Sequence, residues 1–182
     1  MTMLGVEELA ITDVETTGLD ERTHEIIEVG VIVVDYHTLG VIREDTFKVK
    51  PERIELASPE ALRINGYNEE EWKDALSKRA ALIRYDEFIS KARFGGWNSP
   101  FDRRFLRALE RDMGIPLPLD YHETDIASLA LEILRNVAFQ KKFKLDTVAE
   151  FFGLEPEPVP HRALNGARLE LEVFRRLRAF EG

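Results

Sequence analysis

The chain has 182 residues, of which 44% are hydrophobic and 32% charged, and its formal net charge is −9. This composition excludes a disordered chain, and the lack of any apolar run near roughly 18 residues excludes a transmembrane helix. The acidic balance argues against a protein that coats nucleic acid by general electrostatics, and the lack of cysteine excludes disulfides and thiolate metal sites. The length suits one domain. Residues 1–9 show no signal-peptide pattern, so we expect a cytoplasmic protein with no membrane partner.

The first third of the sequence predicts β-strands. Residues 26–36 (IIEVGVIVVDY) are the strongest candidate because they are rich in β-branched side chains. Residues 8–15 and 41–49 are the other two candidates. The segment 37–40 predicts a tight turn, so we expect the second and third strands to be antiparallel neighbours.

The rest of the chain predicts mainly helices. Ser58, Pro59 and Glu60 are typical of a helix start, and this helix should end near residues 65–66. Further helices are expected at 79–92, from 99 onwards, at 124–134, 145–152 and 162–180, with a short strand at 94–97 and a proline-rich loop at 155–160. Strands followed by helices that wrap around them predict an α/β layered domain on a mixed sheet.

Two carboxylates lie near the end of the first expected strand. Asp13 and Glu15 are two residues apart, so their side chains point to the same face of a strand. Close carboxylates repel one another unless a cation or a proton lies between them, which favours a metal site. An acidic strand end in solvent is the alternative for this pair taken alone. In the turn that follows, Gly18 is expected to adopt backbone angles that other residues avoid.

Asp102 and His161 are two further candidates. Asp102 lies in the first turn of the helix that starts at residue 99, where an acid commonly serves only to interact with the helix dipole. His161 stands between the proline-rich loop and the last helix. Alone, it is consistent with a surface or capping residue; as a functional residue it would be a base that takes a proton from water.

The order of these features resembles the DEDDh branch of the DEDD 3′–5′ exonucleases, a family with a ribonuclease H-like fold. Residues 11–19 (ITDVETTGL), 97–106 (WNSPFDRRFL) and 161–167 (HRALNGA) are similar to its three motifs. The segments 58–67 (SPEALRINGY) and 124–131 (TDIASLAL) are similar to two further family segments. The resemblance runs from about residue 9 to residue 177, and the three motifs in this order are highly specific.

This resemblance implies a fold, cofactors and residue roles. The expected fold is a ribonuclease H-like mixed β-sheet flanked by α-helices, forming a single 3′–5′ exonuclease domain over residues 1–182. Asp13, Glu15 and Asp102 would hold two divalent cations, Mg²⁺ or Mn²⁺, and His161 would act as the general base. The positions expected to bind substrate are Thr16, Gly18, Leu19, Ala61, Asn65, Asn98 and Phe101.

One position departs from the family pattern. The family places its fourth acid five residues after the histidine, and that position is Gly166 in this chain. Glu170 lies one helical turn further on, about 5.4 Å along the axis, which is far for a direct ligand. Gly166 is consistent with an engineered inactive variant, a natural degenerate member, or a site rescued by another ligand. We expect greatly reduced activity that Gly166→Asp would raise.

The sequence therefore predicts a metal-dependent exonuclease that removes nucleotides from the 3′ end of single-stranded DNA or RNA, impaired at Gly166. The alternative is a non-cleaving module that keeps the fold and binds 3′ ends. A homodimer is a further expectation, because ribonuclease T and oligoribonuclease in this family are dimers. Basic residues near the motifs are either phosphate contacts or plain solvated charges; they are Arg103, Arg104, Arg107, Lys141, Lys142, Lys144, Arg162 and Arg168.

Overall fold

The computed structural model describes residues 8–139 and 141–180, which build a five-stranded sheet of mixed direction. Residues 1–7, where the expectation of no signal peptide mainly falls, lie outside this range. The helices of the described part are all too short or too polar to cross a membrane. The strands are β1 (Glu8–Thr16), β2 (Ile26–Asp35), β3 (Val41–Lys48), β4 (Arg93–Gly96) and β5 (Thr124–Asp125).

The sheet has the order β3-β2-β1-β4-β5. β2 pairs antiparallel with both β1 and β3, whereas β4 runs parallel to β1 and to β5. β1 is therefore a central strand. The helical segments are η1 (Ile54–Leu56), α1 (Pro59–Asn65), α2 (Lys78–Ile89), α3 (Ser99–Met113), α4 (Ile126–Ile133), α5 (Leu145–Phe151) and α6 (Ala163–Ala179).

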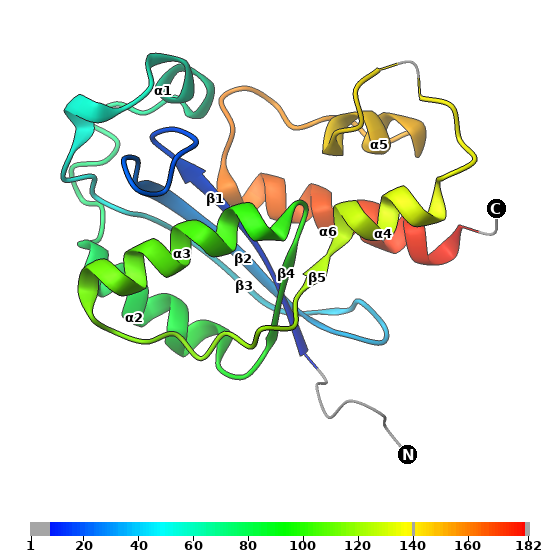
Figure 1. The fold of residues 1–182 in the computed structure, drawn as a ribbon, viewed down its shortest axis with the longest axis horizontal. Helices are drawn as coiled ribbons and strands as arrows, with labels where there is room; N and C mark the ends of the chain where they lie inside the picture. The colour runs from blue at the N-terminus through cyan, green and yellow to red at the C-terminus, as the bar shows by residue number, and fades with distance from the viewer. Residues whose placement is uncertain (1–7, 140, 181–182) are drawn as a thin grey trace.

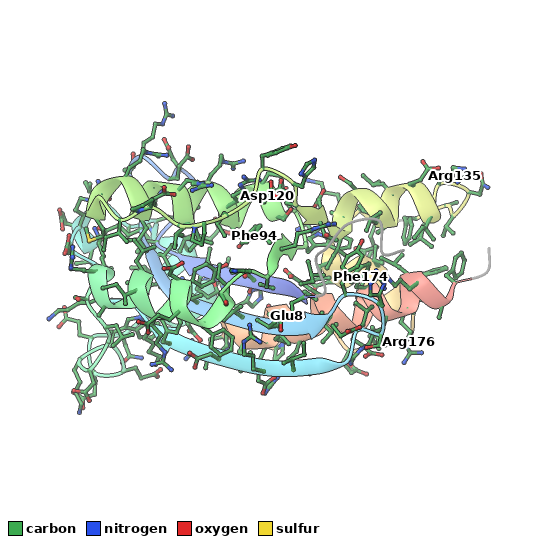
Figure 2. The ribbon with its side chains drawn as sticks, turned by 90° about the horizontal axis from the view of Figure 1, so that it is seen from below. Glu8, Phe94, Asp120, Arg135, Phe174 and Arg176 are labelled. Atoms are coloured by element: carbon green, nitrogen blue, oxygen red, sulfur yellow. The ribbon has the colours of Figure 1, made fainter. Side chains whose placement is uncertain are left out.

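Helices cover both faces of the sheet, and each face has its own apolar core (Figure 1). Because side chains alternate along a strand, β1 contributes Ala10 and Val14 to the core under α2 and α3, and Leu9 and Ile11 to the core under α4, α5 and α6. Phe94 of β4 belongs to the first core and Phe174 of α6 to the second. In Figure 2 both lie in the interior of the molecule, while Arg135 and Arg176 lie at the periphery.

Most of the expected elements are confirmed. The antiparallel strands and the turn between β2 and β3 are present. Ser58 caps α1 by accepting a hydrogen bond from the Ala61 N–H at 3.5 Å, and Gly66 ends it with a left-handed φ of 64°. The helix expected at 145–152 and the final helix also form, as α5 and α6.

The prediction of a helix at 124–134 was wrong for its first two residues. Thr124 and Asp125 form β5 instead, because they pair with Gly95 and Gly96 of β4. The helix α4 begins at Ile126, two residues later than expected, and Asp125 caps it by accepting the Ser128 N–H at 3.2 Å. The short helix η1 was not expected from the sequence.

Gly30 of β2 allows the first turn of α6 to approach the sheet. It stands opposite Asp13 in the β1–β2 register. A Cβ at Gly30 would overlap the backbone of Ala163 and Leu164, at the start of α6. Because this contact is with backbone rather than with a flexible side chain, the lack of a side chain at Gly30 sets the distance between helix and sheet.

We expect Gly30→Ala to lower the free energy of unfolding by about 1–3 kcal/mol, the usual cost of overpacking a core. Gly40→Ala is the matched control, because its Cβ would meet only the Thr38 hydroxyl at 3.3 Å. Urea unfolding of both variants measures the difference. A Gly30→Ala protein as stable as the Gly40→Ala protein would contradict the proposed packing.

Candidate active site

The C-terminal end of β1 brings together three of the predicted acids. Asp13 and Glu15 lie on the face of β1 that α6 covers, and Asp13 packs directly against Gly166. Asp102 reaches the same strand from the first turn of α3 and is 3% exposed. Its Oδ1 accepts the Val14 N–H at 3.0 Å. Val14 stands between Asp13 and Glu15 in the sequence, so this bond holds the Asp102 carboxylate next to both residues on β1.

His161 is held at the same end of the sheet. Its backbone N–H donates to the Ile64 carbonyl at 3.0 Å, which ties the segment before α6 to α1. In Figure 1, the end of β1 lies between α1 and this segment. His161 Nδ1 is 3.5 Å from Glu157 Oε2, and ligand atoms of Glu15, Glu157 and His161 all lie within 4.8 Å of one another. His161 therefore lies beside Glu15 and Glu157 at the end of β1.

Three further acids of this region are buried or half-buried; Glu157 and Glu28 were not identified from the sequence, and Glu170 was judged far for a direct ligand. Glu157 precedes His161 by four residues, and its Oε1 accepts the Arg162 N–H at 2.9 Å. Glu28 stands opposite Glu15 in the register and is 4% exposed. Glu170 on α6 is 2% exposed. Glu28 and Glu170 could have been found from the sequence, because each is an acid among the apolar residues of a buried strand or of the buried face of a helix.

Burial and mutual repulsion raise the pKa values of these carboxyl groups. Burial, followed by the charges of Glu157 and Glu28, raises the pKa of Glu15 to about 8. Burial also raises the pKa of Asp102 to about 8, and the charge of Glu15 adds to it. The pKa of Asp13 lies well above its usual range because of burial and the charges of Asp102 and Glu15. The metal-free site therefore retains protons at neutral pH.

Burial, with the charges of Asp13 and Asp102, also raises the pKa of Glu170 well above its usual range. The Oε2 atoms of Glu170 and Glu28 have no hydrogen-bond partner in the described part of the chain, so the end of β1 would carry excess negative charge whenever these carboxyl groups ionise. Oxygen donors with such an excess are the ligands that Mg²⁺ and Mn²⁺ prefer.

Several positions expected to bind substrate surround these acids. Leu19 is 80% exposed. Asn98 is exposed at the N-terminus of α3 with a left-handed φ of 55°, and half-buried Phe101 packs against Phe105 with ring centroids 5.0 Å apart. Ala61 is half-buried in the first turn of α1.

Two other expected substrate positions have their polar groups engaged within the protein. Asn65 is buried: its Nδ2 donates to the Thr16 carbonyl at 3.0 Å, and its Oδ1 accepts the Tyr67 N–H at 3.2 Å. The Thr16 hydroxyl donates to the Gly18 carbonyl at 2.6 Å. These bonds attach α1 to the end of β1.

The expectation for the backbone of Gly18 was wrong. Its φ is not in the left-handed region, which the glycines Gly66, Gly114 and Gly153 occupy. A Cβ at Gly18 would instead overlap the ring of His24. Glycine is required there by the close approach of a side chain, and not by an unusual backbone angle.

Some of the basic residues near the motifs have structural partners. Arg103 binds the Asp120 and Tyr121 carbonyls, and Arg107 binds those of Leu117 and Leu119. These two arginines therefore hold the segment after α3. The other engaged cations form exposed or half-exposed ion pairs: Arg104 with Glu21, Lys141 with Glu150, Arg162 with Glu71, and Arg168 with Glu44.

Comparison with known proteins gives the family. The model of the RNase T exonuclease family matches residues 10–174. DNA polymerase III PolC-type of Thermotoga petrophila is 34% identical over 91% of this chain, which corresponds to only 11% of that protein. DNA polymerase III subunit epsilon of Rickettsia conorii is 32% identical over 90% of this chain and 70% of its own length.

Solved structures with the same fold include E. coli Exonuclease I in complex with an oligonucleotide. The similarity has a TM-score of 0.81 at 18% identity and covers 97% of this chain and 41% of that one. The five-stranded mixed sheet with its helices is thus the ribonuclease H-like fold of the exonucleases. The chain belongs to the RNase T exonuclease family, in its DEDDh 3′–5′ branch.

The raised pKa values predict how the stability of the metal-free protein depends on pH. A carboxyl group whose pKa is near 4 in the unfolded chain and about 8 in the folded one binds a proton on folding. This contribution to stability is fully present below about pH 4 and is lost as the pH rises through about 8. We expect the Tm in a chelator to fall between pH 5 and pH 8, and Asp102→Asn to flatten the change. A Tm that is constant or rises over this range would contradict the buried acid cluster.

Proposed function

We propose that the chain is a metal-dependent 3′–5′ exonuclease that hydrolyses the terminal phosphodiester bond of a single strand. The observation that carries this proposal is the convergence of Asp13, Glu15, Asp102 and His161 at the end of β1. The acids come from a strand and a helix, and the histidine from the segment before α6. Membership of an exonuclease family supports this assignment.

The residues present fit two divalent cations. Asp13, Glu15 and Asp102 offer carboxylate oxygens in a buried place where they repel one another, and a bound cation would remove that repulsion. When bound, Mg²⁺ or Mn²⁺ would polarise the phosphate and stabilise the charge that develops during hydrolysis. Residues of this chain would then hold the ions and orient the substrate.

His161 would take the proton of the attacking water. Its Nδ1 faces Glu157, which leaves Nε2 as the nitrogen available to a substrate or water. The carboxylate would favour the tautomer with the proton on Nδ1, so that Nε2 accepts. Glu157 is itself fixed by the Arg162 N–H, so the position of the base depends on the loop before α6.

The proposed substrate is the 3′ end of a single-stranded nucleic acid. An oligonucleotide is bound in the solved structure of E. coli Exonuclease I, which shares the fold. Exposed Leu19 and half-buried Phe101 would pack against the terminal nucleotide, and Ala61 and Asn98 lie at the starts of α1 and α3. Gly18 and Thr16 would shape the turn beneath it, and Asn65 would hold that turn in place.

The alternative function is a module that binds 3′ ends without cutting them. Gly166 favours it, because this position lacks the carboxylate of the family pattern. The presence of His161 beside Glu15 favours hydrolysis, since binding alone needs no general base. We therefore propose an exonuclease with reduced activity in preference to the binding module.

Release of mononucleotides from 3′-labelled single-stranded DNA and RNA, with Mg²⁺ or Mn²⁺, tests the function. We expect slow release by the unchanged chain, a further loss of about 10²–10⁴-fold in His161→Ala, and none detectable in Asp102→Asn. The exposed His122, which pairs with Asp120, gives the control variant His122→Ala. Equal rates in all four proteins would show that release has another source.

Gly166→Asp tests the proposed impairment. A Cβ at position 166 would overlap Asp13 Oδ2, the free end of a side chain that can rotate away. We expect the added carboxylate to raise the rate of release by more than about tenfold, the scale of effects at metal sites. Gly166→Asn has nearly the same volume without the charge, so it should not raise the rate. If neither the chain nor Gly166→Asp releases nucleotides, the binding module is the better description.

A further inference from the structure

Glu170 is a buried carboxylate on α6 that the proposed chemistry has not yet used. It is 2% exposed, and its Oε2 has no hydrogen-bond partner among the described residues. The buried face of α6 is otherwise made of apolar or small residues: Ala163, Gly166, Ala167, Leu171, Val173, Phe174 and Leu177. An ionised carboxylate that is buried without hydrogen bonds to all its oxygens is unfavourable. A ligand that binds the free oxygen, such as a cation, would stabilise it.

The carboxylate of Glu170 points towards the acids of the site. The Trp97 N–H donates a hydrogen bond to it. Its Oε2 lies 3.3 Å from the place that a Cβ of Gly96 would occupy, and the same place is 2.8 Å from the Thr12 carbonyl. Glu170 therefore reaches the end of the sheet where β1 leads into Asp13 and where β4 leads into α3, the helix that carries Asp102.

The separation of one turn between positions 166 and 170 does not place Glu170 out of reach. Side chains on a helix tilt towards its N-terminus, so Glu170 leans back towards Gly166. Glutamate is also one methylene longer than aspartate. The space beside Gly166 is taken by the carboxylate of Asp13, which rests directly on the helix backbone there. The small residue thus brings Asp13 closer to α6, and Glu170 approaches from the next turn.

We propose that Glu170 supplies the fourth carboxylate of the metal site, in place of the acid that the family pattern has at position 166. This inference rests on the proposed function and names the ligand set of the same site. The ions concerned are hard divalent cations, for which Asp13, Asp102 and Glu170 offer oxygen donors from β1, α3 and α6. The chain would keep a four-acid site in which one acid is shifted by a turn of α6, and this shift would leave the activity reduced rather than abolished.

Direct binding of Mn²⁺ tests the proposal without reference to activity. Free Mn²⁺ is measured by electron paramagnetic resonance during titration of the unchanged protein, Glu170→Gln, Asp102→Asn and Glu172→Gln. We expect Glu170→Gln to weaken binding by about 10–100-fold, the scale reported for groups that support metal ligands. Glu172→Gln is the matched control on the same helix, since Glu172 pairs with Arg175 and Arg176 at the surface.

A second variant separates coordination from folding and from charge. Glu170→Asp keeps the charge but withdraws the carboxylate by one methylene, so we expect it to weaken Mn²⁺ binding as Glu170→Gln does. Circular dichroism verifies that each variant is folded. If Glu170→Gln does not fold, Glu170→Asp decides the question. Adding Gly166→Asp to Glu170→Gln should restore most of the lost affinity, because the two positions would then be alternative sources of one ligand.

The outcomes distinguish this inference from the proposed function. If folded Glu170→Gln and Glu170→Asp bind Mn²⁺ as tightly as the unchanged protein while Asp102→Asn does not, Glu170 is not a ligand and the exonuclease proposal stands. If the unchanged protein binds no Mn²⁺, both are overturned. Weakened binding in the Glu170 variants with an unchanged Glu172→Gln protein supports the assignment.

Discussion

Repulsion between buried carboxylates at the end of β1 is the constraint on which the rest of the site depends. Besides burial, the charges of Asp102 and Glu15 raise the pKa of Asp13, and the charge of Glu15 raises that of Asp102. The charges of Glu157 and Glu28 raise the pKa of Glu15, and those of Asp13 and Asp102 raise the pKa of Glu170. Asp102 is buried and Asp13 and Glu15 are half-buried, so protons or cations are needed to balance the charge. A protein that merely displayed acids at its surface would not incur this cost. The cluster also reconciles a net charge of −9 with the proposed nucleic-acid substrate, since bound cations would reverse the local sign.

The fold holds these groups together by fixing each of them to a different rigid element. β1 is paired on both sides, which sets the direction of Asp13 and Glu15. The bond from the Val14 N–H to Asp102 joins α3 to that strand, and the bond from the His161 N–H to the Ile64 carbonyl joins the start of α6 to α1. Gly30 lets α6 come close enough for the histidine to reach the acids. The site thus forms where the central strand ends, as is usual in α/β proteins.

The sequence was informative where local rules decide the structure. Alternation along β1 placed Asp13 and Glu15 on one face, and the capping pattern at Ser58 located α1. It failed where distant segments meet. The strand β5 is only two residues long, so its identity depends on pairing with β4. Gly18 is required by the ring of His24, and Glu157 and Glu170 join the site through packing across the molecule.

The relation between Gly166 and Glu170 shows why a missing motif residue does not by itself define a missing ligand. A metal ion requires oxygen atoms at certain points in space, and a helix packed against a sheet can offer them from two successive turns. Loss of a side chain at position 166 makes room for Asp13 against the helix, while a longer acid one turn further on is directed to the same acids. Without a nearby acid to replace it, a glycine at position 166 would leave the metal site one carboxylate short. A glycine with a buried glutamate one turn further on the same helix fits the proposed ligand set, in which Glu170 takes the place of an acid at position 166.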